Sequence, residues 1–273
     1  PGFCLDHVSF SIPKGSIMGL IGENGAGKST AIYAILDLIR KDSGSVSFLG
    51  KDFTGEHVKL KEEIGVAFDN LGFYETTTPQ QAGKFSSLIY SRWDAGLYRS
   101  YLQKFQISEK KEIRKLSKGM KAKLGIALAL SHHPKLLILD EATSGLDPVM
   151  RDEILDVFLD FVQDENHSIL MSSHISSDLE KIADYITFLH KGKILFSREK
   201  DELIYRYGIV RCGEETFRSM DKKEMLTYRK CDYQWEVLVA DKESAKRKYR
   251  NAVVDNATID DILLLYIKGG KPV

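Results

Sequence analysis

The amino-acid sequence predicts an α/β fold with a mainly parallel sheet at its centre. Short apolar segments alternate along much of the chain with segments whose apolar residues recur at helical spacing. Such alternation is typical of parallel strands that are joined and covered by helices. In addition, the apolar segment 16–21 runs directly into a glycine-rich stretch, and the apolar segment 135–140 ends in acidic residues. Open α/β sheets bind their ligands at this end of their strands.

Up to residue 68 the chain alternates between strand and helix patterns. Residues 8–12 alternate apolar and polar side chains, as in a half-buried strand. Residues 29–40 carry apolar residues at positions i, i+3, i+4 and i+7, which predicts an amphipathic helix. We expect further strands over residues 16–21, 45–49 and 64–68.

Residues 79–130 are expected to be mainly helical. Their predicted inward-facing side chains are Phe85, Leu88, Ile89, Tyr98, Tyr101, Leu102 and Phe105. The alternation then resumes, with strands over 135–140, 168–172 and 185–189 and helices over 149–163 and 177–183. After residue 204 the pattern changes to a strand at 235–239, a charged helix and a closing helix at 259–267. We therefore expect a small α+β extension over residues 205–273.

The composition is that of an ordinary globular protein and gives no electrostatic reason to expect a nucleic-acid partner. Lysine plus arginine and aspartate plus glutamate number 39 each. The three cysteines have no metal-binding spacing and are interpreted as reduced thiols of a cytosolic protein. No apolar run reaches the roughly 20 residues needed to span a bilayer.

Residues 22–30, Gly-Glu-Asn-Gly-Ala-Gly-Lys-Ser-Thr, fit the phosphate-binding pattern G-x-x-x-x-G-K-[ST] between an apolar strand and a helix. Glycines let consecutive backbone N–H groups curl around a phosphate, and the helix N-terminus adds partial positive charge. Lys28 is expected to reach the β- and γ-phosphates, and the Ser29 hydroxyl to help bind Mg²⁺.

Two further segments supply reactive side chains at strand ends. Asp140 and Glu141 follow the strand at 135–140, where Asp140 suits the Mg²⁺ shell and Glu141 could polarise a water molecule. His174 follows the strand at 168–172, from which the sheet would aim it at the γ-phosphate. By itself, a single histidine in this place is more often a solvated or a core residue.

Together with Leu-Ser-Lys-Gly-Met at 116–120, these segments resemble the nucleotide-binding subunits of ATP-binding cassette (ABC) transporters. GENGAGKST corresponds to Walker A, LSKGM to the signature, LLILDE to Walker B, Ser144–Asp147 to the D-loop and His174 to the switch histidine. The resemblance covers residues 1–204 and implies a P-loop ABC ATPase fold, with a β subdomain and a helical subdomain at about 72–130. The chain looks most like exporter ATPases of Gram-positive bacteria, including those encoded beside GntR-type regulators and those that export phenol-soluble modulins.

The resemblance implies ATP and Mg²⁺ as ligands and a head-to-tail dimer, of identical or different cassettes, that encloses two ATP molecules. Glu141, His174 and Lys28 would be the catalytic residues, and Ser117, Gly119 and Asp147 would contact the nucleotide that the partner holds. LSKGM would thus complete a site on the other subunit. The Walker A residues expected to bind the nucleotide are Asn24, Gly25, Ala26, Gly27, Lys28, Ser29 and Thr30.

The sequence departs from the usual pattern of this family at several positions. Lys118 and Met120 change the usual LSGGQ signature, and we expect function with altered interface strength. Asp69 stands where a glutamine is usual; it could ligate Mg²⁺ or be an ordinary loop residue. The aromatic residue that stacks on adenine is expected upstream of Pro1. Phe3 could replace it but is interpreted as a core residue.

The leading hypothesis is an ATPase that drives export of a peptide, toxin or drug through a separate integral membrane permease. It would be held peripherally at the cytoplasmic face of the plasma membrane, with a coupling helix of the permease near residues 69–75. The alternative is an ABC ATPase that acts on ribosomes or DNA. Such proteins usually carry two cassettes or long coiled coils, and neither is present here. A non-hydrolysing regulatory cassette is disfavoured because Lys28, Glu141 and His174 are all present.

Overall fold

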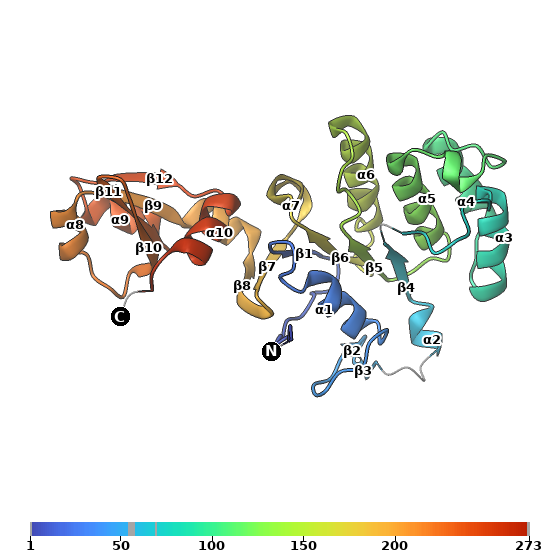
Figure 1. The fold of residues 1–273 in the computed structure, drawn as a ribbon, viewed down its shortest axis with the longest axis horizontal. Coiled ribbons are helices and arrows are strands. Elements are labelled where there is room, and N and C mark those ends of the chain that lie inside the picture. Colours follow the sequence, from blue (N-terminus) through green and yellow to red (C-terminus); the bar gives the residue numbers. More distant parts are fainter. Residues whose placement is uncertain (1, 54–57, 69, 272–273) are drawn as a thin grey trace.

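A computed structural model of the chain describes residues 2–53, 58–68 and 70–271. Figure 1 shows an elongated molecule, in which a larger unit built on a six-stranded sheet is followed by a smaller unit at one end. The six strands of the larger sheet have the order β4-β5-β6-β1-β7-β8. Their bounds are β1 Ile17–Ile21, β4 Ile64–Ala67, β5 Leu136–Asp140, β6 Ser168–Ser173, β7 Tyr185–His190 and β8 Lys193–Glu199.

The pairing of these strands confirms the predicted α/β class. β4, β5, β6, β1 and β7 are all parallel to their neighbours, and β8 pairs antiparallel with β7 at the edge. Because parallel strands point the same way, the loops that follow β1, β5 and β6 meet at one edge of the sheet. The glycine-rich segment after β1, the acidic end of β5 and His174 after β6 all lie at this edge.

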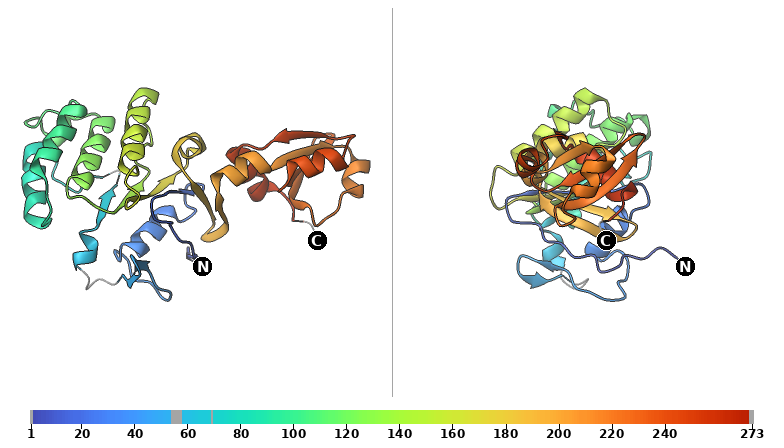
Figure 2. Two further views of the ribbon diagram at one scale, coloured as in Figure 1. Left: turned by 180° about the vertical axis from the view of Figure 1, so that it is seen from behind. Right: turned by 90° about the vertical axis from the view of Figure 1, so that its left-hand side faces the viewer.

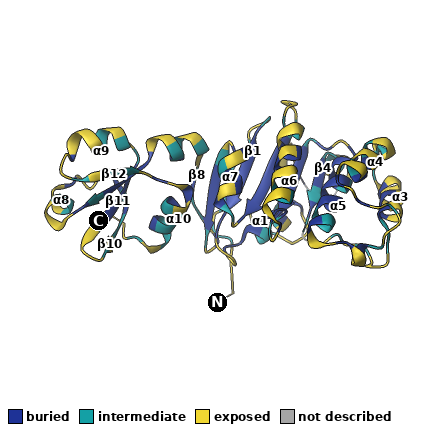
Figure 3. Cartoon of the chain, turned by 90° about the horizontal axis from the view of Figure 1, so that it is seen from above, coloured by how far each residue is buried: buried dark blue, intermediate teal, exposed yellow. Residues whose placement is uncertain are grey.

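Helices cover both faces of the sheet. Met18 and Leu20 of β1 pack with α1 on one face, whereas Ile17 and Ile21 belong to the core that includes α5, α6 and α7 on the other. Figure 3 shows the buried strands beneath helices whose outer sides are exposed. The helices and short strands of this unit are α1 Lys28–Ile35, β2 Ser47–Phe48, β3 Lys51–Asp52, α2 Val58–Lys61, α3 Pro79–Ile89, α4 Ala95–Lys104, η1 Ile113–Lys115, α5 Lys118–Leu130, α6 Pro148–Phe161 and α7 Ser176–Ile182.

Two predicted elements near the N-terminus differ from the structure. Residues 8–12 form no strand, although Val8, Phe10 and Ile12 are half-buried against the core and the intervening serines are exposed. The alternation was therefore real, but the segment joins no sheet. The helix predicted over 29–40 ends at Ile35, because Asp37 adopts a left-handed conformation with φ of 57°.

The prediction that Phe85, Leu88 and Ile89 face inward is wrong. These side chains of α3 are 56%, 79% and 57% exposed. α3 instead buries its small residues, since the ring of Tyr98 lies against Gly83, where an added Cβ would approach Tyr98 Cε1 to 2.4 Å. By contrast, Tyr98, Leu102 and Phe105 are buried as predicted, and Tyr101 is half-buried.

The smaller unit contains a four-stranded antiparallel sheet of order β10-β11-β9-β12. Figures 1 and 2 place this sheet beyond the β8 edge of the larger sheet. α10 returns toward the larger unit and packs against α7, and Ile209, Leu238 and Ile262 share one continuous core with Phe188 and Phe196. The elements of this smaller unit are η2 Glu202–Arg206, β9 Gly208–Cys212, α8 Glu214–Ser219, β10 Met225–Cys231, β11 Gln234–Val239, α9 Lys242–Lys248, β12 Val253–Asn256 and α10 Ile259–Lys268.

Candidate functional site

The loop between β1 and α1 forms an open cradle of backbone. Gly25 and Gly27 adopt φ angles of 81° and 110°, which glycine tolerates without strain. Gly27 precedes α1, and no side chain caps the first amides of that helix. These N–H groups are therefore available to an anion, and the helix dipole favours negative charge at the same point.

Lys28 occupies the first position of α1, and its side chain turns back into this loop. It is 6% exposed, and its Nζ donates to the carbonyl oxygens of Gly22 at 2.8 Å and Glu23 at 3.3 Å. The same ammonium lies 3.1 Å from Oε1 of Glu141. The loop thus fixes a cation next to the carboxylate at the end of β5.

Glu141 is held in an unusual conformation between two polar partners. Its φ is 55°, in the left-handed region that few non-glycine residues adopt. Its Oε1 faces Lys28, and its Oε2 lies 2.5 Å from Nδ1 of His174. Strain of this kind is concentrated at functional sites, where the surrounding structure enforces it.

Asp140 lies beside Glu141 but is buried, and Ser172 fixes its carboxylate. The Ser172 hydroxyl donates to Asp140 Oδ1 at 2.6 Å, and the backbone N–H of Glu141 donates to the same hydroxyl at 3.1 Å. Ser172 was missed by sequence reasoning. It lies on β6 directly opposite Asp140, so only the strand register could have revealed it.

A cleft of about 650 Å³ brings these groups together. Asn24, Gly25, Gly27, Lys28, Ser29, Thr30, Asp140, Glu141, Ser144, His174 and Phe3 line it. Ala26 is buried below the loop, where its carbonyl accepts from the N–H of Gly192 at 2.9 Å. The cleft offers one fixed cation, free helix amides, two carboxylates and a histidine, a set suited to binding a polyphosphate and activating water.

Phe3 corrects an expectation, because it is not a core residue. Its side chain is 54% exposed and lies over the phosphate loop. A Cβ added at Gly27 would come within 2.5 Å of Phe3 Cζ, so only a glycine leaves room for the ring there. The ring thus forms an apolar wall beside the polar cleft.

Ser117, Gly119 and Asp147 form a second group outside this cleft. Ser117 caps α5, with its Oγ accepting from the N–H of Met120 at 3.2 Å. Asp147 caps α6, with its carboxylate accepting from Val149 at 3.1 Å and Met150 at 3.0 Å. The described lining of the cleft includes none of the three. Asp69, the other predicted site residue, lies outside the described residues.

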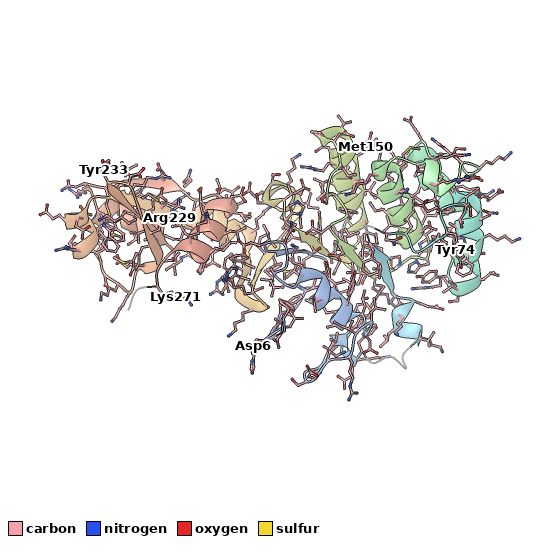
Figure 4. All side chains as sticks on the ribbon, in the orientation of Figure 1. Asp6, Tyr74, Met150, Arg229, Tyr233 and Lys271 are labelled. Atoms are coloured by element: carbon pink, nitrogen blue, oxygen red, sulfur yellow. The ribbon has the colours of Figure 1, made fainter. Side chains whose placement is uncertain are left out.

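A separate groove of about 760 Å³ lies between the sheet edge and the helical region. Phe73, Tyr74, Phe85 and Ile89 are among its lining residues, and Figure 4 shows Tyr74 beside α3. Tyr90, which also lines it, stacks on His132 with ring centroids 3.9 Å apart. Burial raises the pKa of Tyr90 and lowers that of His132, so both stay uncharged at neutral pH. The groove is therefore suited to an apolar partner.

None of the helices in the described ranges has the length and apolar character that crossing a membrane requires.

Comparison with known families and proteins agrees with this geometry. Residues 5–144 match the ABC transporter family. The chain is 36% identical over 199 residues to the lantibiotic transport ATP-binding protein SrtF of Streptococcus pyogenes, covering 72% of this chain and 85% of SrtF. It is also 36% identical over 193 residues to the bacitracin transport ATP-binding protein BcrA of Bacillus licheniformis, covering 70% of this chain and 63% of BcrA.

A solved structure of the ATP-binding subunit of an ABC transporter has the same fold. It superimposes with a TM-score of 0.66 at 27% identity, covering 73% of this chain and 85% of the other.

Proposed function

This chain belongs to the ABC transporter family as an ATP-binding and ATP-hydrolysing subunit, and we propose on that premise that it powers peptide export through a separate membrane subunit. The observation that carries the catalytic part is the pair of contacts that Glu141 makes with Lys28 and His174 inside one cleft. Residues 1–204 would form the ATP-binding domain, with residues 72–130 as its helical part and 205–273 as the C-terminal extension.

The residues of the cleft would have separate roles in hydrolysis. Lys28 and the amides at the start of α1 would hold the β- and γ-phosphates and stabilise the charge that builds up on them. The water oxygen would bond to the γ-phosphorus as the bond to the β–γ bridging oxygen breaks, giving ADP and phosphate. Glu141 would orient that water and accept its proton. Phosphate oxygens would draw Lys28 away from Glu141 Oε1, while His174 keeps hold of Oε2.

The donor set also fits Mg²⁺. Ser29 and Asp140 bring hard oxygen atoms to the cleft, and Ser172 orients the Asp140 carboxylate. The described residues contain no cluster of three or more histidine, cysteine or carboxylate side chains that could hold a metal alone. Binding through one or two protein oxygens and the nucleotide phosphates is the usual arrangement for Mg²⁺. Asp69 would add a third protein oxygen.

ABC ATPases act as dimers with membrane permeases. We propose a head-to-tail pair, in which Ser117, the Gly119 backbone and Asp147 of one subunit contact the ATP held by its partner. Their separation from the cleft of their own chain supports this arrangement. Ser117 also begins α5, a helix of 13 residues whose dipole favours an anion at that end.

The apolar groove beside α3 would receive the coupling helix of the permease and keep the subunit at the cytoplasmic membrane face. Its exposed Tyr74, Phe85 and Ile89 side chains support this role, since an exposed apolar patch of this kind usually marks a contact surface. SrtF is named for lantibiotic transport and BcrA for bacitracin transport, which supports a cargo of a similar kind for this chain.

We expect Ile89→Glu to lose the permease while keeping ATP binding, because it places a charge in the apolar groove but leaves the cleft untouched. The measurement is co-purification of the integral membrane subunit from solubilised membranes, together with ATP affinity of the full chain. Val253→Glu, on the exposed side of β12, is the matched control and should keep the complex. A complex equally stable with either variant would exclude the groove as the docking site.

We expect Phe3→Ala to weaken ATP binding about 2- to 10-fold, the range for loss of one aromatic contact. Binding of inorganic tripolyphosphate should not change, because the ring would touch the nucleoside rather than the phosphates. Phe3→Tyr serves as the control that keeps the ring. Equal losses for ATP and tripolyphosphate would instead assign Phe3 to the shape of the phosphate loop.

A further inference from the structure

The D-loop, residues 144–147, connects the cleft of this chain with its own signature segment. Ser144 lines the cleft at one end of the loop. One residue later, Gly145 has a φ of 70°, and an added Cβ would lie 3.1 Å from Nζ of Lys118 in the signature. Leu146 lies 3.5 Å from the corresponding position on Gly119. A displacement of this short loop would therefore alter both the cleft and the signature segment.

Arg151, on the first turns of α6, holds the loop by its backbone. Its Nη2 donates to the carbonyl oxygen of Leu146 at 3.3 Å, and its Nη1 lies 3.6 Å from Oδ1 of Asp178. Figure 4 shows the neighbouring Met150 at the outer end of α6, near α5. Met150 Sδ lies 2.4 Å from the position of a Cβ on Gly119, so this end of α6 contacts the signature directly.

Asp178 provides the anchor for Arg151. Its side chain is 3% exposed, and it lies in the first turn of α7, a helix that begins two residues after His174. A buried carboxylate is costly without a cation beside it, and Arg151 is the cation that the structure brings to Oδ1. The guanidinium group thus links the helix after the switch histidine to the backbone of the D-loop.

We propose that Arg151 is a positioning residue for ATP hydrolysis. Paired with Asp178, it fixes the D-loop, which lies between the cleft of this chain and its signature segment. The proposal rests on the proposed function, because the signature and Asp147 would serve the site of a partner subunit. The planar guanidinium of arginine can contact Asp178 and the Leu146 carbonyl through two different nitrogens, whereas the single ammonium of a lysine cannot contact both acceptors in this way.

The test compares Arg151→Lys, which keeps a positive charge beside Asp178, with a control on the same two helices. Lys181 of α7 donates to Asp152 of α6 at 2.9 Å, both side chains are exposed, and neither contacts the Leu146 carbonyl that Arg151 holds. Asp152→Asn removes this second link between α6 and α7. The full chain, with its membrane subunit, is measured for kcat, KM, nucleotide affinity and midpoint of thermal unfolding.

We expect Arg151→Lys to lower kcat about 10-fold or more, with KM, ATP affinity and unfolding midpoint close to those of wild type. Asp152→Asn should behave like wild type in all four measurements. A kcat for Arg151→Lys equal to that of wild type would overturn the inference. So would a parallel fall in stability and ATP affinity, because that pattern belongs to a purely structural contact. Absence of Glu141-dependent hydrolysis in the wild-type complex would overturn the proposed function itself.

Discussion

Glu141→Gln is expected to bind ATP nearly as well as the wild-type chain, with turnover reduced on the order of 100-fold or more. The amide keeps the size of the side chain and can still meet His174, but it cannot accept a proton from water. Its neutral charge also frees Lys28 from an ion pair of 3.1 Å, so phosphate binding should not suffer. The measurements are steady-state turnover and equilibrium binding of ATP on the same preparation.

The control for this prediction is Glu23→Gln, at an exposed carboxylate of the phosphate loop that points toward His190 rather than into the catalytic cluster. It should leave turnover close to wild type. If Glu141→Gln lost ATP binding together with turnover, the carboxylate would be a structural or metal-binding group rather than the base.

Mixing two inactive variants is expected to restore one complete ATP site. Lys28→Ala removes the cation of the phosphate cradle, and Ser117→Arg places bulk and charge at the start of α5. Each variant alone should be inactive. In a head-to-tail dimer of the two, one site inherits both defects, while the other combines an intact Lys28 with an intact Ser117.

Occluded ATP, trapped in a Glu141→Gln background, is the appropriate measurement because turnover can require both sites. Differently tagged chains establish that mixed dimers have formed, with the membrane subunit present if isolated chains do not pair. Mixed dimers that occlude no ATP would contradict a composite site for an identical pair. A site closed within one chain predicts the same negative result, because each subunit keeps its own defect.

The parts of the site that could be predicted from the sequence are those in which neighbouring residues determine the geometry. The phosphate loop is one such part, since Gly25, Gly27 and Lys28 specify its shape within a few residues. The acidic end of β5 is another, because a buried parallel strand delivers its last residues to the ligand-binding edge. The α/β class followed from the same local patterns.

The parts that failed depend on contacts between distant segments. Phe3 was assigned to the core because no local pattern shows that the N-terminal segment passes over the phosphate loop. Phe85 and Ile89 have the spacing of a buried helix face, but Tyr98 occupies the side of α3 that packs inward. Apolar periodicity identifies a contact surface without saying whether the protein itself or a partner covers it.

The strands of the smaller unit were mostly missed for a related reason. Arg229, Glu236 and Arg211 lie side by side on β10, β11 and β9 and form ion pairs across the strands. Glu236 is buried among them. Charged residues that satisfy one another on a sheet obscure the apolar alternation by which strands are recognised.

The continuous core between the two units limits where this chain can be divided. Ile209, Leu238 and Ile262 would lose their packing partners if the chain were cut near residue 204, and Phe196 would become exposed on the edge of the larger sheet. The N–H of Ile259 at the start of α10 donates to Glu180 of α7 at 3.1 Å, so the cut would also remove this hydrogen bond between the two units. An ATPase cassette cut out in this way would therefore expose an apolar sheet edge that favours aggregation. Engineered fusions or truncations should keep the last 70 or so residues, because they fold as one cooperative unit with the rest.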